Sequence, residues 1–206
     1  MSSLTVACVL RSGGEYGPKD VNRLRDGVAE YLPGARFVCL VDMALLNVEY
    51  AYLHHDWPGW WAKIELFRPG LFSGRVLYID LDTAVVGPLH DIAAVDAPFV
   101  ALADFNEPRR LQSSVLAWDA GVGEAIYRDF VPQADAIMAT PSWSDQHWMD
   151  AVLRGKYARW QDVVPGQVVS WKRHCRDGVP NGARLVCFHG RPKFADLPPN
   201  GLRWAA

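Results

Sequence analysis

The sequence lacks the features that mark nucleic-acid-binding, membrane and secreted proteins. Its 21 Lys and Arg residues are balanced by 23 Asp and Glu residues, for a formal net charge of −2, so the basic excess of a general nucleic-acid binder is absent. No apolar run has the length of a membrane span. The first apolar run, residues 4–10, is short and has no basic lead-in, so it indicates a β-strand and not a signal peptide. We therefore expect a cytoplasmic protein with no transmembrane segment and no nucleic-acid partner.

Cysteine is scarce, with four residues and no C-x-x-C pair. Because zinc ribbons and thioredoxin-like sites depend on such pairs, neither is indicated. Cys8, Cys39 and Cys187 each lie in an apolar, strand-like run, where a free thiol behaves as a small buried hydrophobe. Only Cys175 lies in a polar stretch, and we expect no disulfide framework.

What the sequence does contain is ample apolar and aromatic surface. Half of the residues are apolar and 21% are charged, which is enough for a sizeable core and excludes disorder. The length of 206 residues predicts one domain, residues 1–206. Nine of the residues are Trp, whose indole suits a core and also suits stacking against a sugar or a base.

Strand-like and helix-like segments alternate along the chain. Continuous apolar strands between helices favour an α/β fold with a mainly parallel central sheet and helices on both faces. In such folds ligands bind beyond the carboxyl ends of the strands. The expected strands are residues 4–10, 36–41, 75–79, 99–103, 114–118 and 184–188, and the expected helices are residues 20–32, 60–67, 122–130 and 145–154.

Two carboxylates directly follow one of the expected strands. Asp80 and Asp82 flank Leu81 after the apolar run 75–79. Carboxylates two residues apart on extended chain point to the same side, about 6–7 Å apart, so both can reach one cation. A Mg²⁺- or Mn²⁺-sized ion takes one or two carboxylates and completes its coordination with water and substrate phosphates. The pair therefore predicts a metal site that a phosphorylated ligand completes.

A second candidate segment follows the last expected strand. His189 leaves that strand, and Gly190 lets backbone approach a ligand closely. Arg191 and Lys193 are cations available to phosphate oxygens. The alternative interpretation is a C-terminal turn with a solvated basic edge.

Together these segments resemble the glycosyltransferases of GT-A fold, particularly the glycogenin and bacterial lipopolysaccharide sugar-transferase type and its small bacterial and viral relatives. The resemblance covers most of the chain and includes residues 61–67, 75–89, 112–118, 145–146 and 189–193. It implies a GT-A-type nucleotide-diphospho-sugar transferase fold and a Mn²⁺ (or Mg²⁺) cofactor. It also implies transfer of a sugar from a nucleotide-diphosphate sugar, with a UDP-sugar as the expected donor, to a hydroxyl of a carbohydrate or glycoconjugate acceptor.

The resemblance also implies roles for individual residues. It makes Asp80, Asp82 and His189 the metal ligands. In sugar transfer, negative charge builds on the leaving diphosphate, where a divalent ion and a cation such as Lys193 would act. The donor contacts that the resemblance implies are Leu10, Arg11, Lys63, Asp80, Leu81, Gln112, Gly190 and Lys193.

The chain departs from the family pattern at two places. The usual late pattern separates its His from a Gly that is followed by Lys-Pro-Trp, whereas His189 and Gly190 are adjacent here and Phe194 follows Lys193. Gln112-Ser113-Ser114 stands where Asn-Ser-Gly is common.

Asp145 is the candidate catalytic base, with an alternative that is equally open. An inverting transfer needs a carboxylate to take the proton of the acceptor hydroxyl, whereas a retaining one needs no such base. The run Ser142-Trp143-Ser144-Asp145 also matches a capping box that opens the next helix. Among the Trp residues, Trp118 and Trp148 are expected in the core, and those of segment 57–61 are candidates for stacking on an acceptor sugar.

Two other functional classes stay open. A haloacid-dehalogenase-like Mg²⁺-dependent phosphatase also places D-x-D after an apolar strand, and Asp145 and Asp150 have a tolerable spacing for its later acidic pair. Against it, Asp80 follows two earlier strand units, and Thr83-Ala84 replaces the usual Gly-Thr step. The second alternative is a nucleotide-sugar-binding module that kept the fold and lost transfer.

Overall fold

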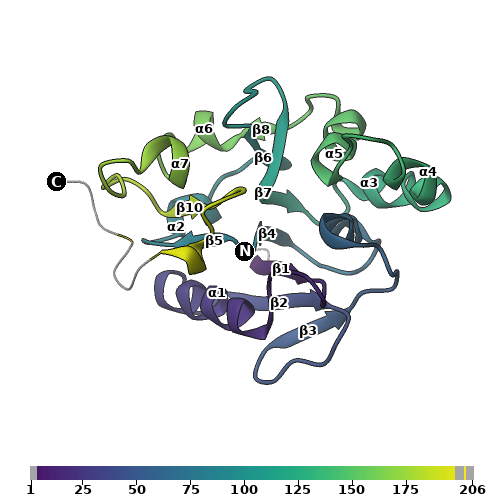
Figure 1. The fold of residues 1–206 in the computed structure, drawn as a ribbon, viewed down its shortest axis with the longest axis horizontal. Helices are drawn as coiled ribbons and strands as arrows, with labels where there is room; N and C mark the ends of the chain where they lie inside the picture. The colour runs from purple at the N-terminus through teal and green to yellow at the C-terminus, as the bar shows by residue number, and fades with distance from the viewer. Residues whose placement is uncertain (1–3, 198–201, 203–206) are drawn as a thin grey trace.

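The computed structural model describes residues 4–197 and Leu202. A seven-stranded sheet with the order β3-β2-β1-β4-β7-β6-β8 forms its centre, beside a three-stranded sheet of order β5-β10-β9 (Figure 1). Every pairing in the large sheet is parallel except the two that β7 makes, with β4 and β6. The strands are β1 (Leu4–Leu10), β2 (Arg36–Val41), β3 (Glu49–Tyr52), β4 (Arg75–Ile79), β5 (Thr83–Val85), β6 (Phe99–Ala103), β7 (Leu111–Asp119), β8 (Ala158–Arg159), β9 (Val168–Ser170) and β10 (Leu185–Cys187).

Helices cover both faces of the large sheet, with α1 on one side and α3, α4 and α5 on the other (Figure 1). The α-helices are α1 (Pro18–Tyr31), α2 (His90–Ala93), α3 (Glu124–Arg128), α4 (Ala134–Met138), α5 (Asp145–Leu153), α6 (Trp160–Val163) and α7 (Trp171–His174). The 3₁₀ helices are η1 (Gly59–Phe67), η2 (Val131–Gln133) and η3 (Phe194–Asp196).

The alternation of side chains along β1 produces two separate cores. Val6 and Cys8 point to one face and pack with the apolar stripe of α1, whereas Ala7 points to the other face and packs with η1 and α5. The second core holds Trp118 and Trp148, which are 2% and 8% exposed, as predicted. A sheet buried on both faces explains why its strands are continuous apolar runs.

The expected α/β architecture is therefore confirmed, with differences at particular elements. The expected helix 122–130 is shorter, because Gly123 has a left-handed φ of +84° and α3 begins only after it. The expected helix 60–67 is the 3₁₀ helix η1. The strand expected at 114–118 begins earlier, at Leu111. The sequence did not indicate β3, β5, β8 or β9, which have two to four residues each.

Candidate active site

Two antiparallel pairings gather the predicted residues at one edge of the large sheet. Because β7 runs against β4, its first residues lie beside the end of β4, and the Asp80 N–H donates to the Ser114 carbonyl at 2.8 Å. Because β10 runs against β5, the Phe188 N–H donates to the Asp82 carbonyl at 2.9 Å. The D-x-D segment is thus held between the start of β7 and the segment that follows β10, at the carboxyl edge where ligands collect in this fold class.

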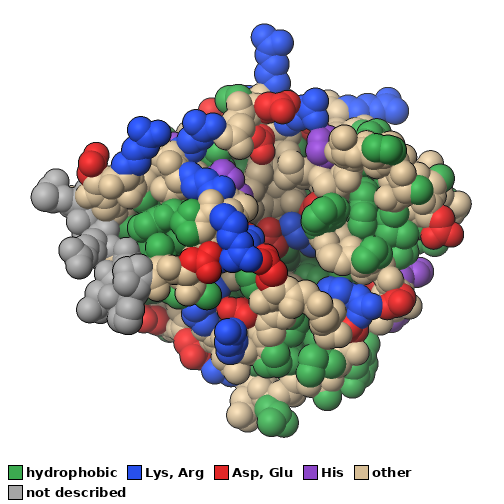
Figure 2. Space-filling model, in the orientation of Figure 1, with side chains coloured by type: hydrophobic (Ala, Val, Ile, Leu, Met, Phe, Trp, Pro, Cys, Tyr) green, Lys and Arg blue, Asp and Glu red, His purple; other side chains and the backbone are tan. Residues whose placement is uncertain are grey.

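A cavity of about 360 Å³ opens at this edge. In the hollow at the centre of the face in Figure 2, acidic and basic side chains lie next to one another. The structure does not place Gln112, Asp145, His189 or Gly190 in the cavity lining. The predicted residues that line it are Leu10, Arg11, Lys63, Asp80, Leu81, Asp82 and Lys193.

Asp80 is held from both sides by neighbouring side chains. Its Oδ1 accepts the Tyr78 hydroxyl at 2.5 Å, and its Oδ2 lies 2.9 Å from Lys63 Nζ. Burial of Tyr78 and the charge of Asp80 raise the pKa of the Tyr78 hydroxyl, so this group stays a donor at neutral pH. The position of the first carboxylate is therefore fixed before any ligand arrives.

Lys63 is the centre of a buried polar network. Its Nζ lies 2.9 Å from Asp80 Oδ2, 3.2 Å from Asp145 Oδ2 and 3.2 Å from Ser113 Oγ. Burial alone lowers the pKa of Lys63, but the charges of Asp145 and Asp80 outweigh it and the net shift is upward. The ammonium is thus permanently charged, and its three contacts are with oxygen atoms of the protein.

Asp82 is less completely partnered than Asp80. Its Oδ2 lies 3.1 Å from Lys193 Nζ and accepts the Tyr16 hydroxyl at 3.4 Å. Its Oδ1 is buried and has no hydrogen-bond partner in the part of the chain that the structure describes. Burial and the charge of Asp80 raise the pKa of Asp82, against the opposing charge of Lys193. An unpaired, buried carboxylate oxygen of this kind suits a cation that binds here.

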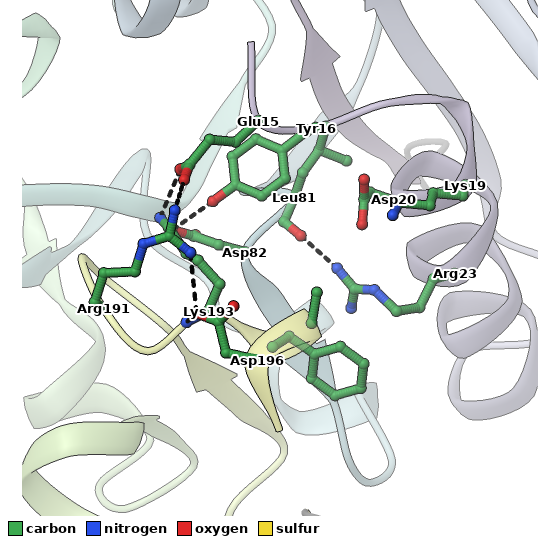
Figure 3. A pocket seen from close by; sticks show the side chains of 12 residues that line it. Glu15, Tyr16, Lys19, Asp20, Arg23, Leu81, Asp82, Arg191, Lys193 and Asp196 are labelled. Atoms are coloured by element: carbon green, nitrogen blue, oxygen red, sulfur yellow. Dashed lines mark hydrogen bonds and ion pairs between the residues drawn. The ribbon is translucent and has the colours of Figure 1, made fainter. Parts of the chain in front are cut away.

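The segment after β10 lies between the site and a smaller neighbouring cavity, which Figure 3 shows. Arg191 pairs with Glu15 of the glycine-rich loop and, at 3.0 Å, with Asp196. Lys193 reaches Asp82, with Glu15 3.8 Å away. These contacts separate the main cavity from a neighbouring one of about 290 Å³, whose lining includes residues of α1 and η3. Lys193 therefore lines the cavity, and its role as a diphosphate contact stays a prediction, while Arg191 joins two loops.

His189 lies apart from the two carboxylates. Its Nε2 is 2.6 Å from Ser170 Oγ, and its ring stacks on Phe105 at 5.4 Å between centroids. Within residues 4–197, no three His, Cys, Asp or Glu side chains gather closely enough to hold a metal ion. The structure thus does not bring Asp80, Asp82 and His189 together as a ligand set, because lysines hold the carboxylates and Ser170 holds the imidazole. The set stays a prediction.

Gly190 is a position that requires glycine. Its φ is +70°, and Lys172 Nζ lies 2.8 Å from the point that a Cβ would occupy. A side chain there would strain the backbone, and the flexible end of Lys172 would have to move aside. The close approach of the Gly190 backbone to a ligand stays a prediction, and this residue lies outside the cavity lining.

Asp145 is neither open to the cavity nor a helix cap. It is 3% exposed, and it accepts the Ser113 hydroxyl at 2.6 Å besides its contact with Lys63. The capping-box interpretation is wrong, because the N-cap of α5 is Ser144 and Ser142 stands outside the helix. The general-base role stays a prediction, and the observed contacts show that Asp145 holds Lys63 in place.

The side-chain amide of Gln112 and the two terminal nitrogens of Arg11 also contact the protein itself. The Gln112 amide donates to Ser114 Oγ at 2.5 Å and accepts from the Ser114 N–H at 3.1 Å. Arg11 lines the cavity, but its guanidinium pairs with Asp42 and Asp56. Both remain predicted donor contacts.

The tryptophans of segment 57–61 divide into two groups. Trp57 and Trp61 are 7% and 4% exposed and pack on Phe130. The interpretation of these two as sugar-stacking residues is therefore wrong, since their faces are used in the core. Trp60 alone of the three lines the cavity, and it is 54% exposed.

Several residues that shape the site were not predicted from the sequence. Tyr16 reaches Asp82 across 66 positions of sequence, and Ser113 reaches Asp145 across 32. Tyr78 is the exception, because it lies near the end of β4, two residues before Asp80, and residues two apart on extended chain share a face. That spacing was available in the sequence, whereas the long-range pairs were not.

None of the helices within residues 4–197 is both long and apolar enough to cross a bilayer.

Comparison with solved structures finds sugar transferases. The galactosyltransferase LgtC, solved with donor and acceptor sugar analogues, superposes with a TM-score of 0.68 over 92% of this chain and 88% of LgtC, at 11% identity. GlyE of Streptococcus pneumoniae TIGR4 gives 0.64 over 79% of this chain, at 12% identity, and the bifunctional glycosyltransferase WbbM gives 0.63 over 93%, at 12% identity. The chain spans 46% of the length of each of these two proteins.

Sequence comparison adds no relative: no protein-family model matches the chain, and no curated protein matches it. Likeness at 10–13% identity establishes architecture and leaves chemistry to the residues of the site. The mixed seven-stranded sheet, the helices on both faces and these superpositions show that the chain has a GT-A-like glycosyltransferase fold.

Proposed function

We propose that the protein is a glycosyltransferase that moves a sugar from a nucleotide-diphosphate sugar to a hydroxyl of a carbohydrate or glycoconjugate. The observation that carries the proposal is the cavity at the end of β4, in which Asp80, Asp82, Lys63 and Lys193 meet. LgtC, which shares the fold, was solved with donor and acceptor sugar analogues. The mixture of fixed carboxylates and an ammonium in this cavity suits a phosphorylated sugar ligand.

Metal dependence is part of the proposal, and the donor set fits it. Asp82 offers a buried Oδ1 with no partner among the described residues, and Asp80 precedes it by two positions. Asp80 and Asp82 would hold Mn²⁺ or Mg²⁺, and His189 would have to leave Ser170 to join them. When bound, the ion would act as a Lewis acid on the leaving diphosphate.

The remaining roles belong to the side chains that line the cavity. Lys193 holds its positive charge at the cavity wall, where an anionic phosphate would be stabilised. Leu10 and Arg11, at the end of β1, offer the surface for a nucleoside. Lys63 orients Asp80 and Asp145 rather than binding phosphate itself, because its three contacts are already made within the protein.

Enzyme assays with substitutions at Asp82 test the proposal. We expect the protein to hydrolyse or transfer sugar from one of UDP-glucose, UDP-galactose and UDP-N-acetylglucosamine in the presence of Mn²⁺, and EDTA to abolish this. Asp82→Asn should lower the rate by about a hundredfold, because several kcal/mol of charge stabilisation depend on this carboxylate. Asp129→Asn, at a half-exposed surface pair with Arg128, should leave the rate unchanged.

Three outcomes would contradict the proposal. Full activity of Asp82→Asn would remove the carboxylate from the chemistry. Turnover of p-nitrophenyl phosphate, with none of a nucleotide sugar, would indicate a phosphatase. Affinity for nucleotide sugars without turnover in any metal would indicate a binding module.

A further inference from the structure

Trp60 is an exposed indole that the fold does not use. It is 54% exposed, and it belongs to none of the three hydrophobic clusters of the described residues. Its sequence neighbours Trp57 and Trp61 are buried against Phe130. A large aromatic face left in water forgoes the stabilisation that burial would give, so a structural role does not account for Trp60.

The helix type places Trp60 directly over the polar network. Trp60 and Lys63 are three residues apart on η1, and side chains at i and i+3 of a 3₁₀ helix lie one above the other. Both side chains line the same cavity. Trp60 therefore forms an apolar wall next to Lys63 and Asp80, at a part of the cavity that is open to solvent.

The chemistry beside Trp60 favours a sugar ring over a phosphate or a base. Lys63 already contacts Asp80, Asp145 and Ser113, so no uncommitted cation is offered to a phosphate at this wall. Carboxylate oxygens accept hydrogen bonds from hydroxyls. A pyranose has one apolar C–H face and a rim of hydroxyls, which together match an indole next to carboxylates. Leu10 and Arg11, at the end of β1, also line the cavity and offer a surface for the nucleoside.

We propose that Trp60 is the stacking platform for a pyranose ring of the acceptor, and that it selects carbohydrate acceptors over other hydroxyl compounds. This inference rests on the proposed function. The half-exposed position of Trp60 suits a ring that enters from solvent after the donor is bound.

The experiment follows the indole N–H signals of the ¹⁵N-labelled protein by NMR, with Trp60 assigned from Trp60→Phe. The probes are UDP with Mn²⁺, and then lactose, maltose and methyl β-D-galactopyranoside added to the UDP-saturated protein. We expect at least one of the sugars to shift the Trp60 signal, and UDP alone to leave it in place. Trp60→Ala should weaken the binding of that sugar about tenfold, whereas Trp60→Phe should keep most of it.

Tyr52→Ala is the matched control, because Tyr52 is equally exposed, at 54%, and lies on the edge strand β3 outside the cavity. It should not change sugar binding. A Trp60 signal that moves with UDP alone would overturn the inference in favour of a nucleobase platform. A signal that moves with none of the probes, or sugar affinity unchanged in Trp60→Ala, would also overturn it.

The same data separate this inference from the proposed function. Sugar binding at Trp60 in a protein that does not bind UDP would support the platform and defeat the nucleotide-sugar transferase. Hydrolysis of UDP-sugars that persists in Trp60→Ala, while transfer to the sugar acceptor falls, is the result that both proposals expect. A protein that binds neither UDP nor any of the sugars would overturn both.

Discussion

Lys63 joins two parts of the chain that the sequence separates widely. It stands on η1, and its ammonium contacts Asp80 after β4 and Asp145 at the start of α5. The side chains of Lys63 and Asp145 are only 12% and 4% exposed. In such surroundings the loss of one partner leaves an uncompensated buried charge, which costs more than the pair itself contributes.

Replacing Lys63 by Met tests this at the level of one residue. The variant should lower the free energy of unfolding by about 3 kcal/mol, because Asp80 and Asp145 are left facing each other without a cation. Urea denaturation measures the change. The double variant Lys63→Met with Asp145→Leu should recover part of it, since one of the two unpaired charges is removed. A loss below about 1 kcal/mol would show that water already screens the network.

The residues of the site differ in how far the sequence predicts their positions and contacts. Asp80 and Asp82 could be predicted as cavity residues because they follow a strand, and strand ends face a ligand site in this fold class. The contact of Tyr16 with Asp82 could not, because the conformation of a glycine-rich loop decides it. The hydrogen bond between His189 and Ser170 could not be predicted either, because a side chain that leaves a strand has several partners within reach.

At the level of elements, η1 depends on one buried carboxylate. Glu65 is fully buried, and its oxygens accept the backbone N–H groups of His54 and His55 at 2.7 and 2.9 Å. Arg68 pairs with the same carboxylate at 2.6 Å. Glu65 therefore ties the loop after β3 to the helix that carries Trp60 and Lys63.

The variant Glu65→Gln should loosen this connection. The neutral amide keeps one acceptor oxygen and loses the charge-assisted bonds, so we expect about 2 kcal/mol less stability. Thermal or urea unfolding gives the value. Glu107→Gln is the control, because its pair with Arg110 is exposed, and it should change stability by less than about 0.5 kcal/mol. Equal effects of the two substitutions would contradict the role given to Glu65.

The elements that sequence patterns predicted are those with long apolar runs. β1, β4 and β6 have five to seven residues each and were found at their expected bounds. The short strands β5 and β9 have three residues each and form only because β10 lies between them. Tertiary packing in a cluster around Val186 and Phe188 stabilises this sheet. Strands this short are not marked by a recognisable alternation of apolar and polar residues in the sequence.

At the scale of the whole molecule, partly buried histidines couple stability to pH. Burial and the charge of Arg173 lower the pKa of His174, whose Nδ1 accepts the Ser170 N–H at 2.9 Å. Burial and the charge of Lys172 lower the pKa of His189. The folded chain thus binds these protons less tightly than the unfolded chain, so stability is full above the ordinary histidine pKa of about 6.5 and falls below it.

We therefore expect the free energy of unfolding to decrease as the pH falls from about 7.5 to 5. His174→Gln should reduce the slope of this decrease, because one of the contributing groups is removed. The control variant His90→Gln, at an exposed position, should leave the dependence of the unfolding free energy on pH unchanged. Urea titrations at several pH values give the slopes, and identical slopes for wild type and His174→Gln would contradict the assignment.

We propose that the carboxylates at the end of β4 bind the diphosphate of a nucleotide sugar through a divalent ion, and calorimetric titration with UDP measures this binding. With Mn²⁺ present, wild type should bind UDP, and the affinity should fall at least about tenfold in EDTA and in Asp82→Asn, with melting temperatures confirming that the variant is folded. UDP binding that is equally tight without the metal and without the Asp82 carboxylate would show that these carboxylates do not bind the diphosphate through an ion.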